Sequence, residues 1–73
     1  MKPLTQVQIR LMQNIARYHQ RHQRLPRYVW LENQLNLSFH SIKNNLNQLR
    51  VAAGVKRTSQ LLLWWLSFEK EVR

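Results

Sequence analysis

Apolar and polar positions follow a helical period along most of the chain, and residues 37–55 show this pattern most clearly. At about 100° per residue, the apolar side chains of this segment fall on one line. They are Ile42, Leu46, Leu49 and Ala53. Ser38 precedes them as an N-cap, and Gly54, the only glycine of the chain, follows in the position of a left-handed C-cap. The pattern therefore predicts a capped helix with one buried face.

A second helical pattern lies near the start of the chain. Thr5 and Gln8 have the spacing of a capping box, so we expect a helix that begins at Thr5 and continues to about His19 or beyond. Its apolar positions form two neighbouring rows, Ile9, Met12 and Ala16 in one and Leu11, Ile15 and Tyr18 in the other. Two rows indicate contact with more than one neighbouring helix.

A short helix is predicted between these two. The basic stretch HQRHQRLPR at residues 19–27 contains Pro26, which favours a break near Leu25 and a new helix with Pro26 in its opening turn. The buried side of this helix consists of Tyr28, Leu31 and Leu35, flanked by Val29 or Trp30. A tight connection at residues 36–37 then leads into the central helix, which makes the pair a helix-turn-helix.

The last predicted helix is capped by Thr58 or Ser59, runs to about Glu71 and is apolar nearly all round. Its apolar residues are Leu61, Leu62, Leu63, Trp64, Trp65, Leu66 and Phe68. One face can dock on the domain, and a second face left in water is typical of an interface. We therefore expect a homodimer or another protein partner, with Leu61, Trp64, Trp65 and Phe68 at the dimer interface.

Length and charge narrow the function. The chain has 73 residues, no cysteine, and 12 lysines and arginines against three acidic residues, for a formal charge of +9. We expect one small all-α domain of four helices whose first candidate partner is nucleic acid, with an anionic membrane surface as the second. The membrane is disfavoured because the basic residues cluster in connectors and in the central helix, not opposite the Trp/Leu face.

The start of the chain and its apolar runs bear on location. Residues 1–3 lead straight into polar positions, so no signal peptide is expected. The longest apolar run, residues 61–66, is far too short to span a bilayer. We therefore expect a cytoplasmic protein.

The polar stripe of the central helix carries the candidate chemistry. His40, Lys43, Asn44 and Asn47 point away from the apolar line, with Arg50 on the flank. Asparagine can pair with an adenine edge and lysine with guanine or phosphate, so the stripe suits reading of the major groove. A plain solvated face is the alternative. Arg50, Lys56 and Arg57 are interpreted as phosphate anchors.

Other polar residues give weaker signals. Arg17, Arg21, Arg24 and Arg27 fit either a phosphate-facing arm or a solvated basic loop. His19 and His22 lack a third ligand nearby, so we expect neither metal nor cofactor. With Glu32, Glu69 and Glu71 as the only acids and no cysteine nucleophile or glycine-rich loop, an enzyme is not expected.

Residues 37–66, LSFHSIKNNLNQLRVAAGVKRTSQLLLWWL, resemble the C-terminal half of the LuxR/NarL/GerE-type DNA-binding domain. The matching positions are Ser38, Ser41, Ile42, Lys43, Leu46, Leu49, Gly54, Val55, Ser59 and Leu62, without a gap, and Leu4-Thr5 resembles the family's opening L-T. The sequence departs from the family at Glu32, Asn45, Ala53 and Leu61, and its first connection is longer by about seven residues.

The resemblance implies a four-helix domain whose third helix enters the major groove and whose fourth helix pairs two copies. It assigns Lys43, Asn44 and Asn47 to the groove and Ser41 and Lys56-Arg57 to phosphates. The expected function is a sequence-specific, dimeric, DNA-binding transcriptional regulator, free-standing or part of a longer protein. The alternative is a small helix-turn-helix protein that pairs with a larger regulator and modulates it.

Overall fold

The computed structural model describes residues 4–72, with side chains described as far as Phe68. Four helices account for most of this range, and it contains no strand, so the predicted all-α class with four helices is confirmed. The helices are α1 (Gln6–His22), α2 (Tyr28–Leu35), α3 (Phe39–Ala53) and α4 (Thr58–Val72). The side chains of Glu69 and Glu71 lie outside the described residues. Residues 1–3, on which the expected absence of a signal peptide depended, also lie outside them.

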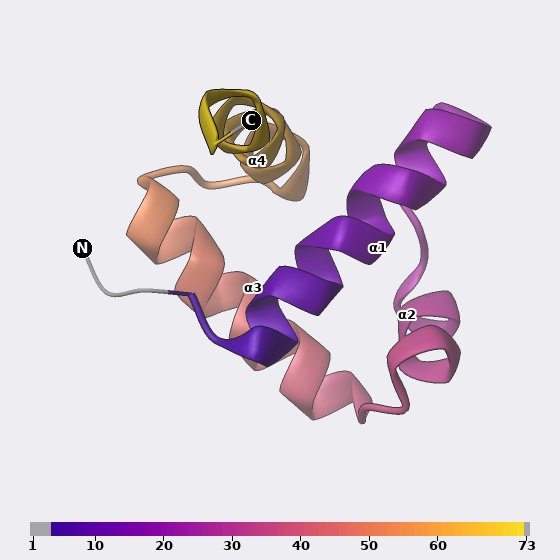
Figure 1. Ribbon diagram of the computed structural model, residues 1–73. Coiled ribbons are helices and arrows are strands. Elements are labelled where there is room, and N and C mark those ends of the chain that lie inside the picture. The colour runs from indigo at the N-terminus through magenta and orange to yellow at the C-terminus, as the bar shows by residue number, and fades with distance from the viewer. Residues whose placement is uncertain (1–3, 73) are drawn as a thin grey trace.

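Helix α1 is the element on which the others pack. It contacts α2, α3 and α4, while α3 lies between α2 and α4 along the chain and contacts both. Figure 1 shows α1 running diagonally across the molecule, with α2 beside its C-terminal half, α3 crossing behind it and α4 seen nearly end-on. The two rows of apolar residues predicted for α1 are explained by these several neighbours.

All four helices contribute to a single apolar core. Its buried members are Leu11, Met12, Ile15, Leu31, Leu35, Ile42, Leu46, Leu49, Leu61, Leu62 and Trp65. Each residue of the predicted α3 line is covered, since Ile42, Leu46 and Leu49 are fully buried and Ala53 packs partly buried at its end. This burial fixes which side of α3 remains in contact with solvent.

Local capping chemistry starts α1, and starts and ends α3, where the sequence predicted it. The Thr5 hydroxyl accepts from the Gln8 backbone N–H and the Gln8 side chain accepts from the Thr5 backbone N–H, each at 3.1 Å, which completes the capping box. The Ser38 hydroxyl accepts from the Ser41 backbone N–H at 3.2 Å. Gly54 ends α3 in the left-handed region at φ 72°, where a residue without Cβ is least strained.

The predicted start of α2 is wrong. Pro26 does not lie in the first turn, because Arg27 takes an extended N-cap conformation (φ −78°, ψ 156°) and the helix begins at Tyr28. The first helical hydrogen bond runs from the Leu31 N–H to the Arg27 carbonyl at 3.2 Å. The first residue of α2, Tyr28, packs its ring against Phe39 of α3, with 5.1 Å between the ring centroids, a contact between helices that favours this start.

The predicted cap of α4 is also wrong. The Arg57 carbonyl accepts the first helical bond, from the Leu61 N–H at 3.0 Å, so Arg57 and not Thr58 or Ser59 occupies the N-cap position. The Gln60 side chain satisfies the free backbone N–H groups of Lys56 and Arg57, both at 3.1 Å. The Thr58 hydroxyl is thereby left for a partner on α3.

Helix α4 buries one part of its apolar surface and exposes the rest. Leu61, Leu62 and Trp65 lie in the core, whereas Leu63 is 69% exposed and Leu66 is 40% exposed. Leu61 and Trp65 were expected at a dimer interface, but they are covered by their own subunit because α4 docks on α1 and α3 through them. No helix in residues 4–72 combines the length and apolar character needed to cross a membrane.

Candidate nucleic-acid interface

The side of α3 opposite the core carries the polar stripe. Its members His40, Lys43, Asn44 and Asn47 are all exposed. They recur at intervals of three and four residues, which keeps them on one stripe of the helix. In Figure 1, α3 runs along the lower left of the molecule, behind the N-terminal part of α1 and below α4.

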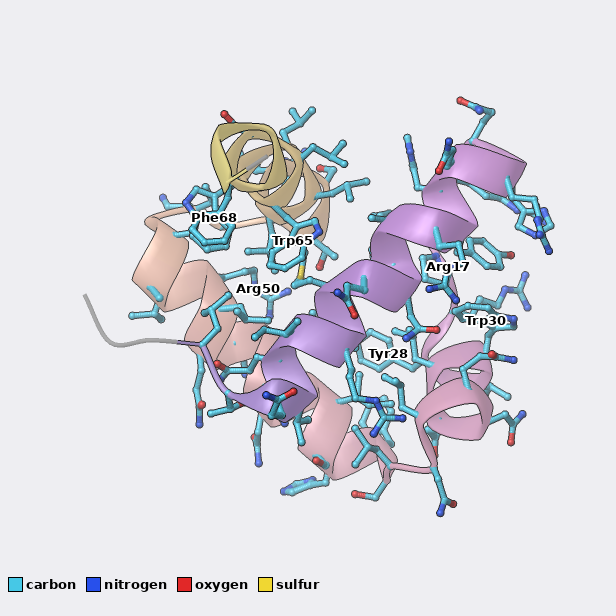
Figure 2. All side chains as sticks on the ribbon, in the orientation of Figure 1. Arg17, Tyr28, Trp30, Arg50, Trp65 and Phe68 are labelled. Carbon is cyan, nitrogen blue, oxygen red and sulfur yellow. The ribbon has the colours of Figure 1, made fainter. Side chains whose placement is uncertain are left out.

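Arg50 extends the stripe toward α4 and is bonded within the chain. One guanidinium nitrogen donates to the Thr58 hydroxyl at 3.0 Å, and the other terminal nitrogen donates to the side-chain oxygen of Asn47. Figure 2 shows Arg50 pointing from α3 toward α4. Arg50 is half-buried, unlike Lys43. The phosphate contact predicted for it would have to compete with these two hydrogen bonds.

Ser41 lies at the edge of the stripe and is engaged by its own helix. The Asn45 side-chain nitrogen donates to the Ser41 carbonyl at 2.8 Å and to its hydroxyl oxygen at 3.4 Å. The backbone N–H of Ser41 is already bonded to Ser38. Asn45 therefore holds the Ser41 hydroxyl in place at the beginning of α3, next to the exposed side chains of the stripe.

Lys56 and Arg57 follow the C-terminal end of α3. Both side chains are exposed, while both backbone N–H groups are held by the Gln60 side chain. The connector thus has a fixed backbone and two cations free to meet an anionic partner. Lys43 near the start of α3 and this connector at its end spread positive charge along the length of the helix.

Val51 is a residue of this face that the sequence reasoning missed. It is 82% exposed, and at 100° per residue it falls between His40 and Asn44 on the stripe. A single exposed valine is common on protein surfaces, but at this place on the stripe its methyl groups would be available for apolar contact with a thymine methyl in the major groove. The helical period from His40, Asn44 and Asn47 pointed to position 51.

The arginines of residues 17–27 lie elsewhere. Arg17, Arg21, Arg24 and Arg27 are all exposed, along the C-terminal half of α1 and its connector to α2. Figure 1 places the end of α1 at the upper right and the beginning of the α3–α4 connector at the left. Arg24 nevertheless lies near the start of α4, because it lines the same groove as Ser59. The ring of His22 packs against Tyr18, with 4.3 Å between centroids.

An apolar groove lies between the end of α1 and α4. It encloses about 310 Å³ and is lined by His19, Arg24, Leu25, Ser59, Leu62, Leu63 and Leu66. Three of its seven lining residues are leucines of α4, and the basic residues come from α1 and the connector. The groove adjoins the part of α4 that remains exposed.

Comparison with known proteins finds no family model that matches this chain, and no curated protein or solved structure matches it. The resemblance of residues 37–66 to the LuxR/NarL/GerE-type domain therefore stays a prediction made from the residues. The features of the structure that bear on function are the exposed stripe of α3, the neighbouring cations and the exposed part of α4.

Proposed function

We propose that this protein is a sequence-specific DNA-binding transcriptional regulator of the LuxR/NarL/GerE type, with α3 as the helix that enters the major groove. The observation that carries the proposal is the exposed stripe of α3. It offers amide and lysine side chains, which can hydrogen-bond base edges, on a helix whose other side is anchored in the core.

The arrangement of α2 and α3 supports the interpretation of this pair as a helix-turn-helix motif. Asn36 ends α2 in the left-handed region at φ 55°, and Ser38 caps α3 two residues later. The short turn fixes the angle between the two helices through local bonds and through the Tyr28–Phe39 contact. A recognition helix held in this way can be presented rigidly to a duplex.

The charge of the chain supports a polyanionic partner. A formal charge of +9 on 73 residues favours DNA through release of counterions, independent of sequence. Lys56, Arg57 and Ser41 are the proposed phosphate contacts, and His40, Lys43, Asn44 and Asn47 the proposed groove contacts. Half or more of the hydrogen bonds in such interfaces go to the DNA backbone, which is why the connector cations are assigned to phosphates.

Helix α4 is proposed to pair two copies of the chain. The surface available for this is the exposed part of α4, which contains Leu63, Leu66 and Phe68 and the half-buried Trp64. Phe68 packs on both neighbouring tryptophans, 6.0 Å from Trp64 and 5.8 Å from Trp65 between centroids. Pairing through these side chains would remove the apolar surface on both exposed flanks of α4 from water.

The test is a selection of bound duplexes from a library of genomic DNA, repeated at about 50 and about 200 mM salt. We expect one enriched motif for the wild type, a specific affinity lowered by roughly 1–3 kcal/mol in Lys43→Ala, and a loss shared by all sequences in Lys56→Ala. Equal binding of every sequence by the wild type and by Lys43→Ala would contradict the proposal.

A second candidate function is an interaction module that pairs through α4 with a larger regulator and modulates it. The observation in its favour is the apolar groove of about 310 Å³ beside the exposed leucines of α4. Capture of a chromosomal regulator, abolished by Leu66→Glu and without any DNA affinity of the isolated protein, would favour this function. Recovery of a homodimer that binds DNA by itself would count against it.

A further inference from the structure

Arg50 connects a side chain on the exposed stripe of α3 to the first residue of α4. Its guanidinium donates to the Asn47 side-chain oxygen and, at 3.0 Å, to the Thr58 hydroxyl. We propose that Arg50 is a positioning residue that orients Asn47 so that its amide nitrogen faces the duplex, and that Asn47 therefore recognises a hydrogen-bond acceptor on a base. The inference rests on the proposed function and deepens it.

The chemistry of the guanidinium determines which way the Asn47 amide turns. A guanidinium has only donors, so the atom that it meets on Asn47 must be the oxygen. The amide nitrogen, on the other branch of the side chain, is then left for an outside partner. Because Arg50 is half-buried and Asn47 is exposed, the orienting group lies inward of the side chain that it orients.

Thr58 restrains the arginine itself. The hydroxyl belongs to the first turn of α4, whose start is fixed by the Gln60 side chain on the Lys56 and Arg57 backbone. A long side chain bonded at both terminal nitrogens loses its freedom to swing toward a phosphate. The docking of α4 on α3 therefore sets the direction of a side chain on the α3 stripe.

A fixed amide nitrogen has a definite preference among bases. In the major groove guanine, adenine and thymine each present an acceptor, whereas cytosine presents only its amino donor. Asn47 should therefore disfavour cytosine on the strand that it contacts, by roughly tenfold. A freely rotating asparagine would instead use its oxygen and nitrogen together and select adenine.

Three variants separate these possibilities in a selection from random duplexes. Arg50→Met removes the guanidinium donors and keeps the aliphatic stem. The base position of the selected motif that Asn47 contacts, here called the Asn47 column, should then narrow to adenine. Asn47→Asp retains an acceptor for Arg50 but has no amide nitrogen, so the same column should change to cytosine, whose amino group donates to a carboxylate. Asn33→Asp, the matched control, adds the same charge at an exposed position of α2, outside the proposed contacts, and should leave that column unchanged.

A second measurement on the free protein keeps the two proposals distinguishable. In wild-type protein labelled with ¹⁵N, the guanidinium nitrogens of Arg50 should give resolved, slowly exchanging signals that collapse in Thr58→Val and in Asn47→Ala. If these signals are already averaged in the wild type, the positioning role is overturned whether or not DNA is bound. Circular dichroism verifies that each variant is folded.

The selection then decides the base preference. A motif in which the Asn47 column is the same in wild type, Arg50→Met and Asn47→Asp overturns the inference while leaving the proposed function intact. A wild-type library without any enriched motif overturns the proposed function and the base preference with it. Resolved Arg50 signals together with a change confined to one column would support both.

Discussion

The side-chain nitrogen of Gln8 donates a hydrogen bond to the side-chain oxygen of Gln48 across 3.0 Å, which joins α1 to α3 over 40 positions of the chain. Gln8 is only 7% exposed, and its side-chain oxygen also accepts from the Thr5 backbone N–H in the capping box. The Gln8 side chain thus completes the N-terminal cap of α1 and also links α1 to α3, the helix that carries the candidate interface.

Replacing Gln8 by alanine is expected to cost about 2 kcal/mol of unfolding free energy, measured by urea denaturation. The variant loses half of a capping box and one bond between helices, each worth about 1 kcal/mol. Gln48→Ala is the matched control. It removes only the bond between helices at an exposed position, so we expect a loss of about 1 kcal/mol or less. Equal losses in both variants would show that the capping bond contributes nothing.

Of the three left-handed helix ends in the described residues, Gln23 and Gly54 give opposite expectations. Gly54 has φ 72° and no atom within 4 Å of an added Cβ, so Gly54→Ala should destabilise by about 1 kcal/mol through backbone strain alone. Gln23 has φ 60° at the end of α1, so Gln23→Gly should stabilise by up to about 1 kcal/mol. Thermal unfolding of both variants measures this difference. Destabilisation by Gln23→Gly of the size seen for Gly54→Ala would contradict it.

Leu46 is the α3 residue whose truncation tests the core most simply. It is 1% exposed, and Leu46→Ala should lower the unfolding free energy by roughly 2–5 kcal/mol through lost burial and the cavity left behind. For a domain of this size such a loss approaches the whole stability. Val51→Ala on the same helix, at a position 82% exposed, should change stability by less than about 0.5 kcal/mol.

Pairing through α4 predicts a change of oligomeric state without a change of fold. Leu63→Glu places a charge on a side chain that is 69% exposed in the subunit, so the monomer should keep its helical content while the dimer dissociates. Sedimentation equilibrium measures the effect. Val29→Glu is the control, because Val29 is exposed to nearly the same extent, 66%, but lies on α2. A wild type that sediments as a monomer at all concentrations would contradict pairing.

Local signals were sufficient to predict most helix ends. The Thr5–Gln8 box, the Ser38 cap and the Gly54 end depend on residues within a few positions of one another, and all three are present. The starts of α2 and α4 could not be found in this way. Arg27 and Arg57 carry no capping side chain that marks them, and the contacts made there are the Tyr28–Phe39 packing and the hydrogen bonds to the Gln60 side chain.

The exposed face of α3 was predictable because its aliphatic line is narrow, whereas the orientation of α4 was not. Nearly every residue from 61 to 66 is apolar, so periodicity alone cannot separate Leu61 and Trp65, which are buried, from Leu63 and Leu66, which are exposed. The bond from Arg50 to Thr58 also escaped prediction, because it depends on how α3 and α4 meet.

The most direct test of the central claim is an NMR titration of ¹⁵N-labelled protein with the duplex obtained by selection. If α3 reads DNA, the largest shift changes will fall on Lys43, Asn44, Asn47 and the Lys56-Arg57 connector, and Arg10 and Arg17 on the exposed side of α1 will change little. The largest changes on α1 or α4, with the α3 stripe unaffected, would contradict the account.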